Sequence, residues 1–411
     1  MHNTKPYVLT RWSVPFAGFL VALMGGFSYA WGVFIVPLSE KYNWSTAEAS
    51  LPFTAYILFL AFVMVPAGKL QDQYGPKKIS IIGSILFFIA YGLASLVSYF
   101  PSPWWLIMTY GVLGGTASAL TYACAAPTAR KWFPDKPGFA ISVAVMGVGL
   151  AALFVAPLKA DFLLPELGIE KTLLFMGILS GTVCLFASWL FRDPPVDWKP
   201  EGWIAGKTKN KTSEIRREAT PMEVLKSPVF YTMWFSFFLV VAGGMMCIGL
   251  LPAFGEKILG LTPISASIAI SIFAGFNGLG RPFAGYLSDK FGVVWVMIFT
   301  YSLQAVAFLT FHLFATTAAT LYISSAIFGW GVAVTLAVFP TLTAICFGTK
   351  NLGVNYGLVI TALGIGAIAP AIGSWIFDLT GSYTPTFFSA GVMSVIGVGL
   401  SIVLKKKYLL S

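Results

Sequence analysis

Two octapeptides, GKLQDQYG at residues 68–75 and GYLSDKFG at residues 285–292, share the pattern GxLxDxxG and lie 217 positions apart. The tetrapeptides MGVG at 146–149 and LGIG at 363–366 are separated by the same offset. Two unrelated patterns at one offset indicate an internal repeat. The repeated unit occupies about half of the 411-residue chain.

The composition around these repeats is that of an integral membrane protein. Hydrophobic residues make up 57% of the chain, charged residues only 10%, and the mean hydropathy is +0.81, whereas an ordinary soluble domain has about 25% charged residues. Apolar runs long enough to cross a hydrocarbon core of about 30 Å as helices recur along the chain. We therefore expect an all-α membrane protein with twelve transmembrane helices, near residues 13–37, 48–68, 79–99, 104–128, 137–159, 171–191, 228–255, 262–285, 293–314, 318–341, 352–377 and 384–404.

Lysine and arginine predict the orientation. With both termini in the cytoplasm, 21 of the 26 basic residues fall on the cytoplasmic side. The opposite face then has four, namely Lys41, Lys159, Lys171 and Lys257, and Arg281 is left inside a span. Cytoplasmic segments carry such an excess of positive charge, so we expect both termini inside.

A polar stretch divides the spans into two groups of six. It predicts an N-terminal six-helix bundle at 1–191, a cytoplasmic linker at 192–227 and a C-terminal six-helix bundle at 228–411. The segment TPMEVLK within the linker favours a short surface helix. Duplicated bundles of this kind place a substrate site near the bilayer midplane, between the halves.

GxLxD followed by basic residues, as in GKLQDQYGPKK, resembles the loop signature of the major facilitator superfamily after its second and eighth helices. Both copies fall at those places here. The resemblance implies two pseudo-symmetric bundles that work by alternating access. Asp72 and Asp289 would then be gating residues, which accept hydrogen bonds from a neighbouring helix N-terminus in one conformation and lose them in another.

Three further stretches resemble the oxalate:formate antiporter family and the related monocarboxylate transporters. They are GGFSYAWGVFIVPL, TYACAAPTARKWFPDKPGFA and NGLGRPFAGYLSDKFG. In that family an arginine of the eighth helix binds the substrate carboxylate. The resemblance assigns this role to Arg281.

The residues themselves lead to the same arginine. Arg281 precedes Asp289 by eight positions, or about 12 Å along a helix, which is close to the midplane. A cation there costs about 2.5 kcal/mol or more unless it faces water or an anion. All sixteen acidic residues fall in loops or near helix ends, so neutralisation by a buried carboxylate is the weaker interpretation.

Neighbouring positions shape the predicted site. Asn277, one turn before Arg281, can orient the guanidinium but cannot carry a proton, unlike the aspartate of animal monocarboxylate transporters. Leu363 stands in TALG where the antiporter has a lysine, so one cation implies one carboxylate. The family's aromatic cavity residues correspond to Tyr29, Tyr122 and Trp330, to which we add Tyr56; packing or interface anchoring is the alternative for each.

These features predict a secondary transporter of small monocarboxylates such as lactate or pyruvate, working by proton-coupled symport. The alternatives are an organic-anion exchanger of the oxalate:formate type and a sensor on a transporter fold. An enzyme, an ATP-driven pump, a cofactor, a metal site and a nucleic-acid partner are not expected, since the spans lack clustered His, Asp or Glu and the chain has no GxxxxGK[ST] loop. We expect a monomer, spanning the cell (inner or plasma) membrane many times.

Overall fold

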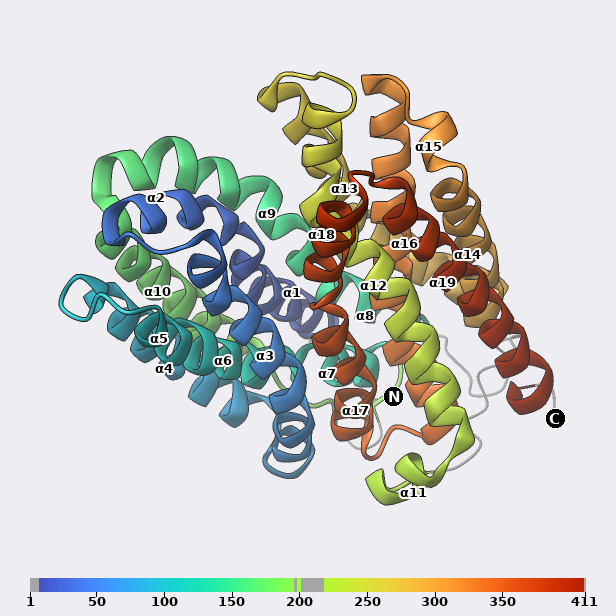
Figure 1. The fold of residues 1–411 in the computed structure, drawn as a ribbon. Helices are drawn as coiled ribbons and strands as arrows, with labels where there is room; N and C mark the ends of the chain where they lie inside the picture. Colours follow the sequence, from blue (N-terminus) through green and yellow to red (C-terminus); the bar gives the residue numbers. More distant parts are fainter. Residues whose placement is uncertain (1–6, 196–197, 201–217, 410–411) are drawn as a thin grey trace.

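The computed structural model describes residues 7–195, 198–200 and 218–409. Within these ranges the chain is helical and contains no strand. Helices gather in two groups, with α1–α10 on one side and α12–α19 on the other (Figure 1). Residues 196–197 and 201–217 of the predicted linker lie outside the described residues.

The N-terminal half is built from helices that follow the expected spans. Their bounds are α1 Tyr7–Gly25, η1 Gly26–Ala30, α2 Gly32–Tyr42, α3 Thr46–Tyr74, α4 Pro76–Ala94, η2 Ser95–Ser98, α5 Pro103–Leu106, η3 Ile107–Gly114, α6 Gly115–Tyr122, α7 Ala125–Trp132, α8 Pro137–Val145, α9 Gly147–Pro157, η4 Leu158–Leu163 and α10 Leu164–Leu190. The segments η1 and η2 are 3₁₀ turns, and η3 and η4 are π-helical.

The C-terminal half repeats this plan. Its helices are α12 Pro228–Lys257, α13 Pro263–Phe291, α14 Val293–Leu309, α15 Phe311–Phe314, α16 Ala318–Phe347, α17 Leu352–Gly366, α18 Ala369–Thr380, α19 Thr384–Val403 and the π-helical η5 Leu404–Leu409. Between the halves lies α11, Pro221–Lys226, which begins at a capping box of Thr220 and Glu223. This is the predicted surface helix.

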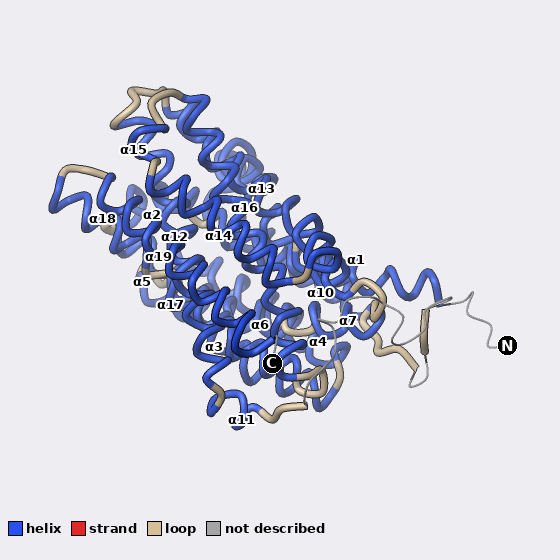
Figure 2. Tube along the Cα trace, turned by 90° about the vertical axis from the view of Figure 1, so that its right-hand side faces the viewer, coloured by secondary structure: helices blue, strands red, loops and turns tan. Residues whose placement is uncertain are grey.

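Twelve spans result when consecutive helical segments are joined. Eight helices in the described ranges are long and apolar enough to cross a membrane by themselves. The other four expected spans are made by helices that are interrupted, short or less apolar. They are α5–α7, which is divided into several segments, α13, which has polar residues at its centre, the short α14, and α17 with α18. The all-α, multi-pass architecture predicted from the apolar runs is confirmed. The tube view shows helices joined by short loops (Figure 2).

Several expected boundaries were wrong, and polar residues explain why. The run expected to end at residue 285 continues as α13 to Phe291, because Asp289 and Lys290 extend the helix beyond the apolar part. The run expected at 352–377 is interrupted after Gly366 and restarts at Ala369, followed directly by Pro370. Proline cannot donate a helical hydrogen bond, which favours a restart there.

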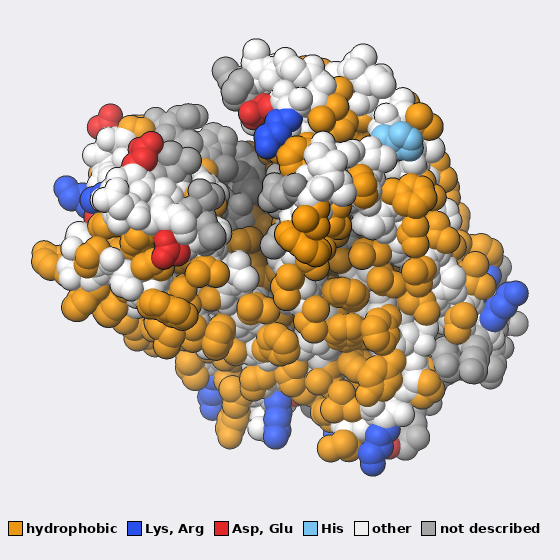
Figure 3. Space-filling model, in the orientation of Figure 1, with side chains coloured by type: hydrophobic (Ala, Val, Ile, Leu, Met, Phe, Trp, Pro, Cys, Tyr) orange, Lys and Arg blue, Asp and Glu red, His pale blue; other side chains and the backbone are white. Residues whose placement is uncertain are grey.

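One face of the molecule carries the basic loops. Arg11 at the start of α1 forms an ion pair with Asp135, and Lys131 pairs with Asp193 at 2.8 Å, so these segments lie together. The positive-inside rule identifies this face as cytoplasmic. On the opposite side the surface is hollowed between the two halves, and apolar side chains suited to lipid cover much of the face that Figure 3 shows.

Candidate functional site

Arg281 lies in the middle of α13 and is completely buried, with 0% of its surface exposed. Its Nε donates to the carbonyl of Asn277 at 3.2 Å and its Nη2 donates to Asn277 Oδ1 at 3.1 Å. Its Nη1 donates to the carbonyl of Val145 on α8, in the other half of the molecule. All three acceptors are neutral, so the described side chains offer this cation no ion-pair partner.

Asn277 orients the guanidinium from within the same helix. The two residues are four apart, and side chains at that spacing meet on one helix face. Asn277 is itself 92% buried, since only 8% of its surface is exposed. A guanidinium has five N–H groups, and three are used by the acceptors named above. The remaining donors suit a carboxylate.

Three tyrosines from three different spans interact electrostatically with Arg281. They are Tyr29 of η1, Tyr122 of α6 and Tyr356 of α17. Tyr122 and Tyr356 also interact with each other. Tyr122 and Tyr356 are 8% and 2% exposed. The site is therefore made by both halves.

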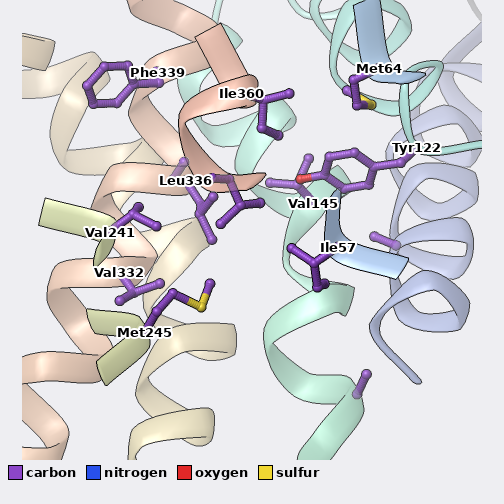
Figure 4. Packing of buried hydrophobic residues seen from close by; sticks show 14 of the residues in the cluster. Ile57, Met64, Tyr122, Val145, Val241, Met245, Val332, Leu336, Phe339 and Ile360 are labelled. Atoms are coloured by element: carbon purple, nitrogen blue, oxygen red, sulfur yellow. The ribbon is translucent and has the colours of Figure 1, made fainter. Parts of the chain in front are cut away.

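Apolar side chains form the walls around this polar group. Figure 4 shows Tyr122 pointing from the N-terminal half toward Leu336 and Ile360 of the C-terminal half, with Ile57 and Val145 on its own side. These four apolar residues are all buried. Such walls accept a small apolar body and penalise any charge other than the one that Arg281 balances.

Leu363 belongs to the same helix face as Tyr356. It lies seven residues further along α17, which is two turns, and it is 4% exposed. A side chain at position 363 is therefore on the face of α17 that carries the site tyrosine. A lysine at position 363 would add a second positive charge on this face, and leucine adds none. This arrangement is compatible with a site that has a single cation.

Two predicted cavity residues form hydrogen bonds to groups other than Arg281. Tyr56 is 0% exposed, packs against Tyr110 at a centroid distance of 5.3 Å and donates to the carbonyl of Gly25 at 3.3 Å, all within the N-terminal half. The indole of Trp330 donates to Thr300 of α14 at 3.2 Å. Both therefore have partners in their own half. The ring of Trp330 nevertheless lies close to the site, because a Cβ atom added to Gly280, the residue before Arg281, would lie 3.1 Å from it.

Tyr356 and Lys159 were missed from the sequence. Tyr356 stands in the segment VNYG, and its two-turn spacing from Leu363 is the signal that could have identified it. The basic-residue pattern places Lys159 on the outer face, at the end of the span expected at 137–159, but it is only 2% exposed. It lies in η4 at the outer end of the fifth span.

The two aspartates of the repeated octapeptides join the halves at the cytoplasmic face. Asp289 accepts from the backbone N–H groups of Gly138 and Phe139 at 2.9 Å each, at the N-terminus of α8. Asp72 accepts from the N–H of Val354 at 3.3 Å, at the N-terminus of α17. Free N–H groups and the helix dipole make such termini good sites for a carboxylate. The cytoplasmic side is closed in this conformation.

Arg130 adds charge to this closed face. It lies near the end of α7, where the carboxylates of Asp289 and Glu218 attract it, although burial lowers the pKa of Arg130 to about 10. Glu218 in turn accepts from the N–H groups of Thr349 and Lys350 at 3.2 and 2.8 Å. Glu218, a linker residue shortly before α11, thus binds the loop that precedes α17.

Comparisons with known proteins agree with this geometry. The family model described as Major Facilitator Superfamily matches residues 16–276 and, in a second match, 233–408. The chain belongs to this superfamily, and it is therefore a membrane transporter and not an enzyme. Its fold is shared with the fucose:proton symporter of Escherichia coli, at a TM-score of 0.71 over 95% of this chain and 98% of that one, with 13% identical residues.

Sequence relatives include transporters of organic anions. The oxalate:formate antiporter of Oxalobacter formigenes is 28% identical over 82% of this chain and 78% of its own length. Monocarboxylate transporter 13 of Bos taurus is 25% identical over 96% of this chain and 89% of its own. The uncharacterized MFS-type transporter YhjX of Escherichia coli is 26% identical over 88% and 87%.

The hydrogen bonds of Asp289 at the closed face lead to a prediction for the transport rate of the Asp289→Asn variant. One of the two hydrogen bonds to α8 and the charge at its N-terminus are lost, which weakens the closed state by about 1–2 kcal/mol. We expect slower exchange of the labelled substrate across vesicle membranes with little change in substrate binding at equilibrium. Asp193→Asn, which removes an exposed carboxylate of the same face, is the matched control. Lost binding with normal exchange would show that Asp289 is not a gating residue.

Proposed function

We propose that this transporter carries small monocarboxylates, such as lactate or pyruvate, by alternating access between its two halves. The observation that supports this best is the fully buried Arg281, whose partners among the described residues are all neutral. A single guanidinium balances a single carboxylate, through two parallel hydrogen bonds. In this proposal the hydroxyls of Tyr122 and Tyr29 donate further hydrogen bonds to the carboxylate or to a hydroxyl of the substrate.

The apolar walls favour a monocarboxylate over a dicarboxylate. A second carboxylate would be desolvated against Leu336, Ile360 or Leu363 without a counter-charge, which costs several kcal/mol. The methyl group of lactate would meet the same walls favourably. The names of the relatives, oxalate:formate antiporter and monocarboxylate transporter 13, support a carboxylate as the substrate class.

Proton coupling is the mode of transport that we favour, with anion exchange as the second candidate. Asn277 replaces a titratable group next to Arg281, so the proton would travel on the substrate or on a group near a gate. Labelled lactate uptake into empty vesicles under an inward proton gradient supports symport. Uptake only into vesicles preloaded with an anion supports exchange. Absence of uptake in both would contradict the proposed function.

Replacing Leu363 by lysine tests the one-cation site. The new ammonium would balance a second carboxylate, so oxalate should compete with labelled lactate much better than it does in the wild type, by about 10-fold or more. Leu363→Met, which keeps the volume and adds no charge, is the matched control. Folding is checked by thermal unfolding, because a new buried cation destabilises the empty protein. Equal binding of oxalate and lactate by the wild type would show that another residue supplies a second charge.

A further inference from the structure

Lys159 is a buried cation outside the group that surrounds Arg281. Its Nζ donates to the carbonyl of Phe27 at 3.1 Å and lies 5.1 Å from the ring centroid of Phe34. Among the side chains that the structure describes, no carboxylate lies within ion-pair distance of it. An ammonium removed from water in this way needs its carbonyl and ring partners.

The first span changes its hydrogen-bonding pattern at the Phe27 carbonyl. In an α-helix the N–H of Trp31 would donate to Phe27, four residues back. Instead it donates to Ser28 at 2.9 Å, as expected for the 3₁₀ segment η1. In a 3₁₀ segment each carbonyl pairs with the N–H three residues on, which leaves a second lone pair on the Phe27 oxygen. Lys159 donates to this oxygen as an additional partner, and its second contact, Phe34, lies beyond the 3₁₀ segment. The ammonium therefore holds both sides of the break.

Close packing brings the fifth span to this segment. A Cβ atom added to Gly26 would lie 2.6 Å from Cβ of Ala151 on α9, so only glycine allows this approach. Lys159 lies eight residues after Ala151, about two turns along, and so continues the same face. The position of its ammonium is thus fixed by the packing of α9 on η1.

The same 3₁₀ segment carries a tyrosine of the site. Tyr29 is two residues after Phe27, and its hydroxyl is in electrostatic contact with Arg281 and Tyr122. Its ring packs edge-on against Phe53 of α3, at a centroid distance of 6.1 Å. One end of η1 is therefore bound by Lys159 while Tyr29 faces the guanidinium.

We propose that Lys159 is a positioning residue for the substrate site: by binding the Phe27 carbonyl and the Phe34 ring it stabilises the 3₁₀ segment that directs the Tyr29 hydroxyl toward Arg281. This role rests on the proposed function, because Tyr29 is taken to bind the same carboxylate. Lys159 itself does not touch the substrate. Its effect on binding therefore passes through Tyr29.

A double-mutant cycle with L-lactate as the probe tests this role. Lys159→Met and Tyr29→Phe should each raise the Kd for lactate by about fivefold, the value of one hydrogen bond. The double variant should be no weaker than either single variant, because both remove the same interaction. Lys159→Arg should restore binding, and Lys171→Met, which removes an exposed lysine, should change nothing. Additive effects, or wild-type binding in Lys159→Met, would overturn the proposal.

A measurement without ligand separates this inference from the proposed function. Meta-fluorotyrosine in place of Tyr29 reports the environment of that ring by fluorine NMR. Its resonance should move and broaden in Lys159→Met, or in Lys159→Gln if the methionine variant does not fold, and remain unchanged in Lys171→Met. An unmoved resonance overturns the positioning role even if lactate does not bind. A moved resonance without lactate binding by the wild type refutes only the proposed substrate.

Discussion

Arg281→Ala is expected to abolish lactate binding and transport while leaving the fold intact. The substitution removes two charge-assisted hydrogen bonds to the carboxylate, worth about 1.5–3 kcal/mol each, so the affinity should fall by about 10²- to 10⁴-fold. The fold should survive because the lost contacts of Arg281 with Val145 and Asn277 are offset by the removal of a desolvated charge.

Equilibrium binding of labelled lactate to the purified protein measures this effect, and thermal unfolding checks the fold. Lys290→Ala, on an exposed turn of the same helix, has the same change in net charge and should bind normally. Arg281→Lys should also bind poorly, because a single ammonium cannot reproduce the two parallel donors. Normal lactate binding by a folded Arg281→Ala variant would refute the site.

Gly68→Val is expected to hold the cytoplasmic side open and to stop transport. A Cβ atom at residue 68 would lie 2.2 Å from the carbonyl carbon of Gly353 and 2.6 Å from the nitrogen of Val354, the donor to Asp72. Backbone atoms cannot move aside as a side chain can, so the closed state should lose about 3 kcal/mol or more. This corresponds to a shift of about 100-fold toward other conformations.

Spin labels at Tyr74, at the end of α3, and at Met222, on α11, measure the shift. Both residues are exposed, and α11 packs against α12 and α17 of the C-terminal half. The distance between the labels should increase in Gly68→Val relative to the wild type. Gly92→Val adds the same side chain where nothing lies within 4 Å, and it should keep the wild-type distance and transport rate. An unchanged distance in Gly68→Val would show that the closed face does not open between these residues.

Much of the fold could be predicted because membrane insertion leaves its requirements in the sequence. Apolar runs give the spans, basic residues give the orientation, and the repeated GxLxDxxG gives the two halves. The hydrogen bond from Arg281 to Asn277 follows from a spacing of four residues within one helix. Such local rules need no knowledge of how the helices are arranged.

The remaining features depend on contacts between distant segments. The 3₁₀ segment η1 has no clear sequence signal, since GGFSYA reads as a normal small-residue stretch of a helix. The burial of Lys159 follows from that segment and from the packing of Gly26 on α9, so the basic-residue pattern alone placed it on the outer face. The packing of Tyr56 on Tyr110 could not be predicted, because the sequence does not show which face of α3 turns into its own half.

An experimental structure with bound lactate tests the central claim most directly. We predict that the lactate carboxylate lies within hydrogen-bonding distance of the Arg281 guanidinium, next to the hydroxyl of Tyr122, with its methyl group against Leu336 or Ile360. Lactate bound at another place, or an empty Arg281 at a lactate concentration that saturates binding, would contradict the proposed site.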